Sequence, residues 1–260
     1  MDIKLIAADL DGTLLDSQKR LPDELPELLA ELRARGVRFA PASGRQYYNL
    51  LALFGDENMT YIAENGAMVF ENGHCLFVDE LPAELVREVL GMVRSLPGAY
   101  PILAGEHSAW CEDSEPVFVA NAEMYYTRLT RVPSLDHVDD RICKIAVFEK
   151  GHAEHGCLPA LRQVTSPAQV VLSGADWVDV MNPGVNKGGA IRKLCASLHL
   201  TPGQCMAFGD YLNDLELLQA VTHSFAMANA HPDIRAACRY QAPSNDENGV
   251  VRSIRSFCGL

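Results

Sequence analysis

Residues 6–15 read Ile-Ala-Ala-Asp-Leu-Asp-Gly-Thr-Leu-Leu, so that Asp9 and Asp11 follow directly on a short apolar run. The apolar run predicts a buried strand, and acids that end such a strand lie at the edge of an α/β sheet, where open parallel sheets bind ligands. Two carboxylates this close repel each other, which pushes their pKa values apart. A divalent cation would relieve that repulsion and give both acids a function.

The composition is that of a globular protein with one large or two modest domains. The chain has 260 residues, of which 48% are hydrophobic and 22% charged. Its net charge of −12, from 22 basic and 34 acidic residues, argues against nucleic acid or an anionic membrane as a partner. An anionic substrate would therefore need a local cation, either a metal ion or a placed lysine.

We expect a cytoplasmic protein. Asp2 and Lys4 precede an apolar stretch that is too short and too charged for a signal peptide, and no run is long enough to cross a bilayer. The eight cysteines contain no Cys-x-x-Cys pair, which favours free thiols in a reducing compartment.

Strands and helices alternate at both ends of the chain. Leu25, Leu28, Leu29 and Leu32 have the spacing of an amphipathic helix. Strands are expected over residues 3–8, 37–40, 61–63, 205–208 and 224–227, and further helices around residues 50–54 and over 187–198, 214–220 and 232–238. Alternation of this kind predicts βαβ units and a mostly parallel sheet.

The middle of the chain breaks this pattern. After a predicted helix over residues 82–96 come strand-like runs over 141–148, 168–173 and 177–181. We therefore predict a Rossmann-like α/β core of residues 1–81 and 184–260, interrupted by an inserted α+β domain of residues 82–183.

Polar residues follow four elements of the predicted core, all at one edge of its sheet. They are Asp9 and Asp11, then Ser43-Gly44-Arg45, then Lys187 at the start of a helix, and last Asp210 with Asn213 and Asp214. Helix N-termini at that edge suit phosphate oxygens. A nucleophile, a second acid, a hydroxyl, a lysine and metal-binding acids are the equipment for phosphoryl transfer through an aspartyl phosphate.

Simpler interpretations exist for each motif alone. An Asp-x-Asp pair can be polar chain leaving a core, and Ser43 can be an ordinary helix cap. Lys187 can be a solvated lysine, although a helix N-terminus disfavours cations. Arg45 contacts substrate or faces solvent. In the insertion, His152-x-x-His155-x-Cys157 has zinc-ligand types at close spacing, but exposed loop histidines are the favoured interpretation because no fourth ligand is apparent.

Taken in order, the four motifs resemble the haloacid dehalogenase (HAD) superfamily of phosphatases, in its Cof-like subgroup with a large α/β cap. The same subgroup is resembled by three further stretches, Ala63-Glu64-Asn65-Gly66-Ala67, Ala226-Met227-Ala228-Asn229-Ala230 and Ser244-Asn245-Asp246-Glu247-Asn248-Gly249-Val250. The resemblance covers the whole predicted core, and the insertion has the place and size of the cap.

The resemblance implies a role for each motif residue. Asp9 is the nucleophile, and Asp11 is the general acid and then the base, its backbone carbonyl also reaching the metal. Phosphate or substrate is bound by Ser43, Gly44, Arg45, Asn65, Gly66 and Asn213. Lys187 offsets the charge between nucleophile and phosphate. Asp210 holds Mg²⁺ with Asp9, and Asp214 supports Asp210 and Lys187 and is counted among the metal-binding acids.

The expected function is a Mg²⁺-dependent phosphatase for a small phosphorylated metabolite, either a sugar phosphate or a nucleotide-like or cofactor-like monoester. The chain would be a monomer or a homodimer, and the insertion would select the leaving group. Two alternatives stay open at this point. One is a phosphomutase with the same nucleophile, and the other is a non-enzymatic phospho-acceptor, which Asp11 and the long insertion argue against.

Overall fold

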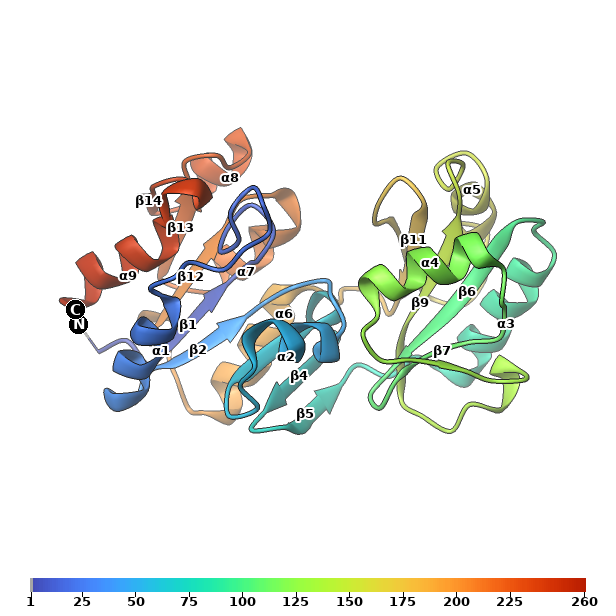
Figure 1. The fold of residues 1–260 in the computed structure, drawn as a ribbon, viewed down its shortest axis with the longest axis horizontal. Coiled ribbons are helices and arrows are strands. Elements are labelled where there is room, and N and C mark those ends of the chain that lie inside the picture. Colours follow the sequence, from blue (N-terminus) through green and yellow to red (C-terminus); the bar gives the residue numbers. More distant parts are fainter. Residues whose placement is uncertain (1) are drawn as a thin grey trace. The chain divides into compact units, whose positions relative to one another are not determined.

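The computed structural model describes residues 2–260 and divides into two compact units (Figure 1). The first unit holds residues 2–44, Asp56–His74 and Asn186–Leu260, and the second holds Arg45–Gly55 and Cys75–Val185. By this division the second unit includes α2 (Tyr47–Phe54) and residues 75–81, which the sequence analysis assigns to the core. The predicted boundaries at 81/82 and 183/184 stay predictions.

The first unit is built on a five-stranded parallel sheet, which confirms the predicted α/β class. The strand order is β14-β13-β12-β1-β2. The strands are β1 (Leu5–Ala8), β2 (Arg38–Pro41), β12 (Cys205–Gly209), β13 (His223–Met227) and β14 (Tyr240–Ala242). All four residues of β1 are fully buried, as expected for a central parallel strand covered on both faces.

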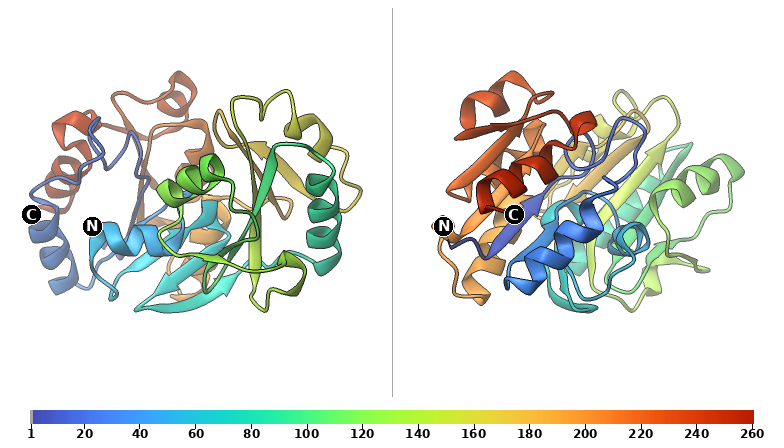
Figure 2. Two further views of the ribbon diagram at one scale, coloured as in Figure 1. Left: turned by 45° about the vertical axis from the view of Figure 1, so that its right-hand side comes forward. Right: turned by 60° about the vertical axis from the view of Figure 1, so that its left-hand side comes forward.

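Helices cover this sheet and bury the apolar faces that their sequences predict. The helices are α1 (Leu25–Ala34), α6 (Lys187–Ser197), α7 (Leu215–Gln219), α8 (Pro232–Ala237) and α9 (Gly249–Cys258). In α1 the leucines 25, 28 and 32 are buried, which confirms the predicted amphipathic helix. Helices α1 and α9 lie side by side on one face of the sheet (Figure 2), where Arg255 bonds Glu31 at 3.0 Å.

The strand predicted over residues 61–63 is present but belongs to a different sheet. β3 (Thr60–Ala63) pairs antiparallel with β4 (Met68–Glu71), and the short 3₁₀ turn Glu64–Gly66 joins the two. A single parallel bridge between Ala42 and Ile62 connects this hairpin to the main sheet. The Asn72-Gly73 turn then leads into β5 (His74–Val78).

The second unit holds a six-stranded sheet of order β10-β11-β9-β6-β7-β8. Its elements are α3 (Ala83–Arg94), β6 (Ala99–Gly105), β7 (Ala109–Cys111), α4 (Pro116–Tyr125), β8 (Leu129–Arg131), β9 (Ile142–Glu149), α5 (Cys157–Leu161), β10 (Gln169–Leu172) and β11 (Trp177–Met181). All neighbours pair antiparallel except β7 and β8. Side chains of α3 and α5 form a core with alternate residues of β9 and β11, including Ile145 and Val178.

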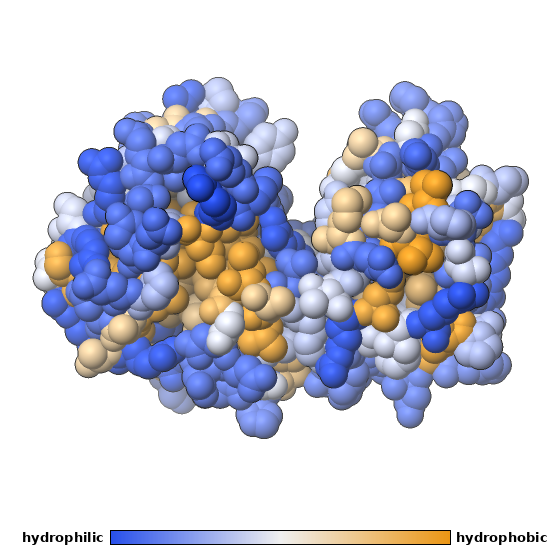
Figure 3. All heavy atoms as spheres, viewed as in Figure 1, coloured by the Kyte–Doolittle hydropathy of each residue, from blue (hydrophilic) through white to orange (hydrophobic). Residues whose placement is uncertain are grey.

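No helix among residues 2–260 has the length and apolar character needed to span a membrane. On the face drawn in Figure 3, apolar atoms reach the surface in patches among hydrophilic ones. The eight cysteines are free in the structure, with Cys195 and Cys205 in contact at 3.4 Å between their sulfur atoms.

Candidate active site

The site begins at Asp9, which is the first residue after β1. Its backbone N–H donates to the carbonyl of Phe208 on the neighbouring strand β12 at 3.1 Å, so the parallel ladder continues to this residue. The chain then turns tightly, because the N–H of Leu14 donates to the carbonyls of Asp9 and Leu10. The turn leaves the carboxylate of Asp9 at the carboxyl edge of the sheet with only 7% of the residue exposed.

Lys187 reaches Asp9 from the first turn of α6. The side chain of Asn186 caps this helix by accepting from the N–H of Gly189 at 2.7 Å. The ammonium of Lys187 lies 2.5 Å from Oδ1 of Asp9 and 2.7 Å from Oδ1 of Asp214, and the residue is 1% exposed. Burial and the helix dipole both disfavour a cation here, so the two carboxylates are what holds it.

Burial and neighbouring charges shift the pKa values of Lys187, Asp9 and Asp210. Burial lowers the pKa of Lys187, but the charges of Asp9 and Asp214 outweigh burial and raise it above its usual value. Burial raises the pKa of Asp9 to about 7, with Lys187 opposing that rise and Asp214 adding to it. Burial likewise raises the pKa of Asp210, which is opposed by a hydrogen bond from Thr13. The cluster of Asp9, Asp210 and Asp214 thus carries more negative charge than the ammonium group of Lys187 can neutralise.

Asp210 and Asp214 extend from the end of β12 on the other side of this cluster. Oδ1 of Asp210 accepts from the hydroxyl of Thr13 at 2.9 Å. Oδ2 of Asp214 accepts from the backbone N–H groups of Asp210 and Tyr211 at 3.1 and 3.3 Å. Carboxylate oxygens of Asp9, Asp210 and Asp214 all lie within 4.8 Å of one another. Hard oxygen donors at this spacing suit a small divalent cation.

Gly12 allows this close approach. Its φ of +85° lies in the region that only glycine adopts readily, and a Cβ built on it would be 2.4 Å from Oδ2 of Asp210. The Asp-x-Asp-Gly-Thr motif therefore supplies Asp9, the predicted nucleophile, together with room for Asp210 and the hydroxyl that donates to Asp210.

Ser43, Asn65 and Gly66 come together beside the start of α6. The N–H of Ser43 donates to the carbonyl of Ile62, and the N–H of Asn65 donates to the carbonyl of Ser43, both at 2.9 Å. A Cβ on Gly44 would lie 3.0 Å from the Asn65 amide, and one on Gly66 would lie 2.4 Å from the carbonyl of Asn186. These contacts link the Ser43 loop to the helix that carries Lys187.

This loop is also strained. Glu64, Asn65 and Gly66 have φ values of +49°, +54° and +93°, and left-handed backbone costs a non-glycine residue on the order of 1–3 kcal/mol. Glu64, which sequence reasoning did not single out, is only 2% exposed. The sequence offers two signals for it, its membership of the Ala63–Ala67 motif and its place between a buried strand and an Asn-Gly pair.

The other predicted residues lie at the surface or in the second unit. Asp11 is exposed, and its Oδ1 accepts from the ammonium of Lys19 at 2.7 Å. Asn213 is exposed in the 3₁₀ turn Leu212–Asp214. Arg45 is the first residue of the second unit. The substrate-binding roles of Asn213 and Arg45 stay predictions.

Asn229 and Asn245 have contacts that the motif resemblance did not specify. The side-chain amide of Asn229 donates to the carbonyl of Gly12 at 2.8 Å, and that of Asn245 donates to the carbonyl of Leu15 at 2.9 Å. Both therefore hold the loop that follows Asp9. The sequence marks these residues as motif members but gives no sign of their partners.

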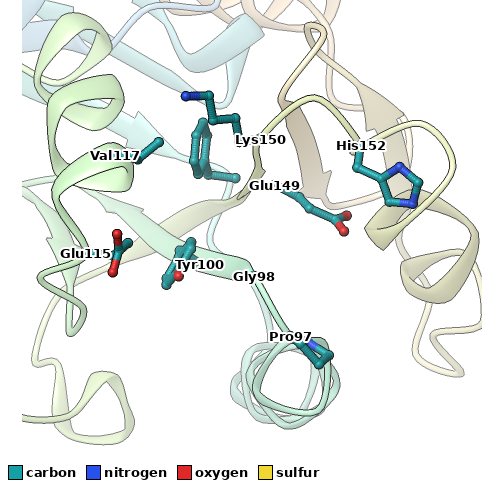
Figure 4. Close-up of a pocket in the computed structure, with 9 residues that line it drawn as sticks. Pro97, Gly98, Tyr100, Glu115, Val117, Glu149, Lys150 and His152 are labelled. Carbon is teal, nitrogen blue, oxygen red and sulfur yellow. The ribbon is translucent and has the colours of Figure 1, made fainter.

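The structure does not gather the histidine motif of the insertion into one site. His152 and His155 are exposed, with ring centroids 6.5 Å apart, whereas Cys157 is buried with its thiol towards the carbonyl of Ala153. His152 instead lines a pocket of about 340 Å³ together with residues such as Tyr100 and Glu149 (Figure 4). Among residues 2–260 the other close group of metal-ligand types is Glu106, His107 and Asp140.

Comparison with known proteins shows the family of this chain. Residues 6–254 match the family model of haloacid dehalogenase-like hydrolases. The chain is 33% identical to the 5-amino-6-(5-phospho-D-ribitylamino)uracil phosphatase of Escherichia coli K12, over 96% of this chain and 94% of that protein. It is 30% identical to the HMP-PP phosphatase of Cronobacter sakazakii, over 90% and 87% of the two chains. The crystal structure of a protein from Eubacterium rectale superposes on this chain with a TM-score of 0.90 at 29% sequence identity. The superposition covers 99% of this chain and 100% of the other chain.

The chain therefore belongs to the haloacid dehalogenase-like hydrolase family, which confirms the resemblance inferred from its motifs. Within that family it is an enzyme of the phosphatase class, a phosphoric monoester hydrolase. Hydrolases of this family generally use a divalent metal ion, and the acidic cluster at Asp9 is where this chain could hold one.

Proposed function

We propose that this enzyme is a Mg²⁺-dependent phosphatase that hydrolyses a small phosphorylated metabolite by transferring the phosphoryl group to Asp9. The observation that supports this most strongly is the buried contact of Lys187 with Asp9 and Asp214, with Asp210 beside them. A lysine held by two buried carboxylates has little use in a hydrophobic core, but it suits a centre that must receive a phosphate dianion.

The donors of this cluster fit a magnesium ion. Asp9 and Asp210, with the backbone carbonyl of Asp11, would hold the ion, because Mg²⁺ prefers carboxylate, carbonyl and water oxygens. We assign Asp214 to orienting Lys187 and the Asp210 backbone, since its two oxygens already accept from those groups. When bound, Mg²⁺ would neutralise the negative charge that Asp9 and the phosphoryl group bring together.

The reaction proceeds in two balanced steps on the residues of this chain. In the first, a carboxylate oxygen of Asp9 forms a bond to phosphorus, the ester P–O bond breaks, and the leaving oxygen takes a proton from Asp11. In the second, Asp11 takes a proton from water as the water oxygen bonds to phosphorus. The acyl-phosphate P–O bond then breaks, and inorganic phosphate leaves with Asp9 restored.

The remaining residues orient and neutralise. The hydroxyl of Ser43 and the N–H of Gly44 would donate to the phosphoryl oxygens, and Lys187 would offset the charge between those oxygens and Asp9. Phosphoryl transfer depends mainly on positioning and charge neutralisation, and these residues can provide both.

The substrate class follows from the relatives. One relative is named for a phosphorylated ribitylaminouracil and another for HMP-PP, so we propose a small phosphorylated metabolite of sugar-phosphate or nucleotide-like and cofactor-like type. The substrate of the Escherichia coli relative is the first compound to test. A cytoplasmic location and a monomeric or homodimeric state stay predictions.

The test is release of inorganic phosphate from a panel of phosphorylated metabolites, assayed with Mg²⁺ and with EDTA. We expect Mg²⁺-dependent release that EDTA abolishes, and a loss of roughly 10³-fold or more in Asp9→Asn, as for removal of other catalytic nucleophiles. Asp23→Asn, a change at an exposed acid of the same domain, serves as the control.

Three results would contradict the proposal. The first is phosphate release that persists in Asp9→Asn. The second is isomerised sugar phosphate with little free phosphate, which would indicate a phosphomutase. The third is a stable phosphoprotein that releases no phosphate, which would indicate a phospho-acceptor.

A further inference from the structure

The segment after the nucleophile forms a compact loop with a charged tip. A bridge pairs Asp11 with Leu15, and the backbone N–H of Asp16 donates to the carbonyl of Arg20 at 3.0 Å. Within the tip, Oδ1 of Asp16 accepts from the N–H groups of Gln18 and Arg20 at 2.9 and 2.8 Å. An aspartate that bonds the backbone two residues further on is a standard means of forming a tight turn.

This turn places Lys19 in an unfavourable backbone conformation. Its φ is +63°, in the left-handed region that non-glycine residues avoid. From there its ammonium reaches back to Asp11, where it lies 2.7 Å from Oδ1. The side chains of Lys19 and Asp11 are 62% and 41% exposed.

Stability does not explain this contact. An ion pair this exposed contributes little to the stability of a protein, because water and salt screen it. Left-handed backbone at a lysine costs more than such a pair returns. A glycine at position 19 would make the same turn without that cost, so the lysine side chain has another use.

Hydrogen bonds from other segments hold the backbone of this loop in place. At its base, Asn229 and Asn245 donate to the carbonyls of Gly12 and Leu15, and near its tip the N–H of Ser17 donates to Oδ1 of Asp246 at 2.7 Å. The loop is thus fastened to two other segments of the first unit. These bonds fix the backbone of the loop and hold Lys19 within reach of Asp11.

We infer that Lys19 is a positioning residue for Asp11. This inference rests on the proposed function, in which Asp11 gives a proton to the leaving oxygen. The ammonium of Lys19 donates to Oδ1 and orients the carboxyl group of Asp11 for proton transfer to the leaving oxygen. A carboxyl group protonated on one oxygen still accepts on the other, so the contact persists through the transfer.

The test compares two esters that differ in their need for a proton. A sugar phosphate, the one from the panel that the wild type hydrolyses fastest, has an alkoxide leaving group that must be protonated. p-Nitrophenyl phosphate has a leaving group that departs as a stable anion. We expect Lys19→Met to lower kcat/KM for the sugar phosphate about tenfold and for p-nitrophenyl phosphate by less than about threefold, since general acid catalysis contributes only where a proton is needed.

Two further variants separate the side chain from the backbone. Lys19→Gly relieves the left-handed conformation but removes the ammonium, and should behave like Lys19→Met. Lys19→Arg keeps a donor cation and should recover to within about threefold of the wild type on both esters. Arg20→Met is the matched control, because Arg20 lies next to Lys19 and pairs with Asp16 instead, at 2.8 Å. It should leave the ratio of the two esters unchanged.

Each other outcome overturns the inference. Equal losses on both esters in Lys19→Met, an equal loss in Arg20→Met, or full activity in Lys19→Gly would show that Lys19 does not position Asp11, while the proposed function stands. A wild type that releases phosphate from no metabolite of the panel would overturn the proposed function itself, and this inference with it.

Discussion

At the scale of single residues, the site depends on how closely its elements approach. Gly12 is the clearest case, because a Cβ there would lie 2.4 Å from one carboxylate oxygen of Asp210 and 2.9 Å from its carboxyl carbon. Asp210 cannot move away freely, since Thr13 holds its other oxygen. Asp210, a proposed metal ligand, can therefore occupy its position only because residue 12 has no side chain.

We expect Gly12→Ala to lower the affinity for Mg²⁺ more than it lowers the stability of the folded protein. The added methyl group displaces Asp210, and loss of a supporting contact at a metal site typically costs about 10–100-fold in affinity. The measurement is the Mg²⁺ concentration for half-maximal phosphatase activity, which should rise at least tenfold. Gly36→Ala is the control, because Gly36 also has a left-handed φ, of +69°, but has open space around it. An unchanged Mg²⁺ requirement in Gly12→Ala would contradict this role.

The charged residues of the site could be predicted from the sequence, but the contacts that support them could not. Carboxylate oxygens of Asp9, Asp210 and Asp214 lie within 4.8 Å of one another. Lys187 bonds Asp9 and Asp214, although Lys187 and Asp9 are 178 residues apart in the chain. They were predictable because each follows the carboxyl end of a strand or opens a helix. The Lys19 contact and the left-handed backbone at Glu64 were not, because both depend on tertiary contacts that no local pattern encodes.

At the scale of elements, α3 is fastened to the segment before β10 by one carboxylate. Glu88 accepts from the hydroxyl and N–H groups of both Thr165 and Ser166, with distances from 2.6 to 3.1 Å. The hydrogen bonds from Ser166 and Thr165 lower the pKa of Glu88 to about 2. They stabilise the ionised form, which links this contact to pH.

We expect Glu88→Gln to lower the urea midpoint of unfolding at pH 7, with an effect that becomes smaller as the pH falls below about 4.5. The pKa of Glu88 is lower in the folded chain than its ordinary value of 4.5. Its contribution is therefore complete above about pH 4.5 and is lost as the pH falls towards 2. Urea unfolding of wild type and variant at pH 7, 5 and 3.5 measures this, with Glu84→Gln on the same helix as the control. A difference between wild type and Glu88→Gln that stays constant with pH would be inconsistent with it.

Elements were predictable where their periodicity is strong. The helix α1 and the strand β11 fall where the apolar spacing indicates, and β11 has the predicted bounds of 177–181. The strands β6, β7 and β8 were not predicted. β6 contains Pro101, which is uncommon within a strand, and β7 and β8 are three residues each, too short to show a period.

At the scale of the whole molecule, chain topology explains why motifs far apart in sequence form one site. β1 lies between β2 and β12, so the residues after these three strands share one edge of the sheet. This much follows from strand–helix alternation and the parallel sheet it implies. The interruption between β2 and β12 was also visible in the sequence, but the arrangement of the second unit was not. Its mixed sheet, with one parallel pair among antiparallel ones, has no sequence signature.

The central claim is that the carboxylate of Asp9 becomes an acyl phosphate during turnover. The most direct measurement is acid quenching of the enzyme while it hydrolyses a ³²P-labelled substrate with Mg²⁺, followed by mapping of the label by peptide mass spectrometry. We predict one phosphoryl group on the peptide that contains Asp9, removable by hydroxylamine and absent from Asp9→Asn. Continued turnover with no label on that peptide, or with the label on another residue, would contradict the claim.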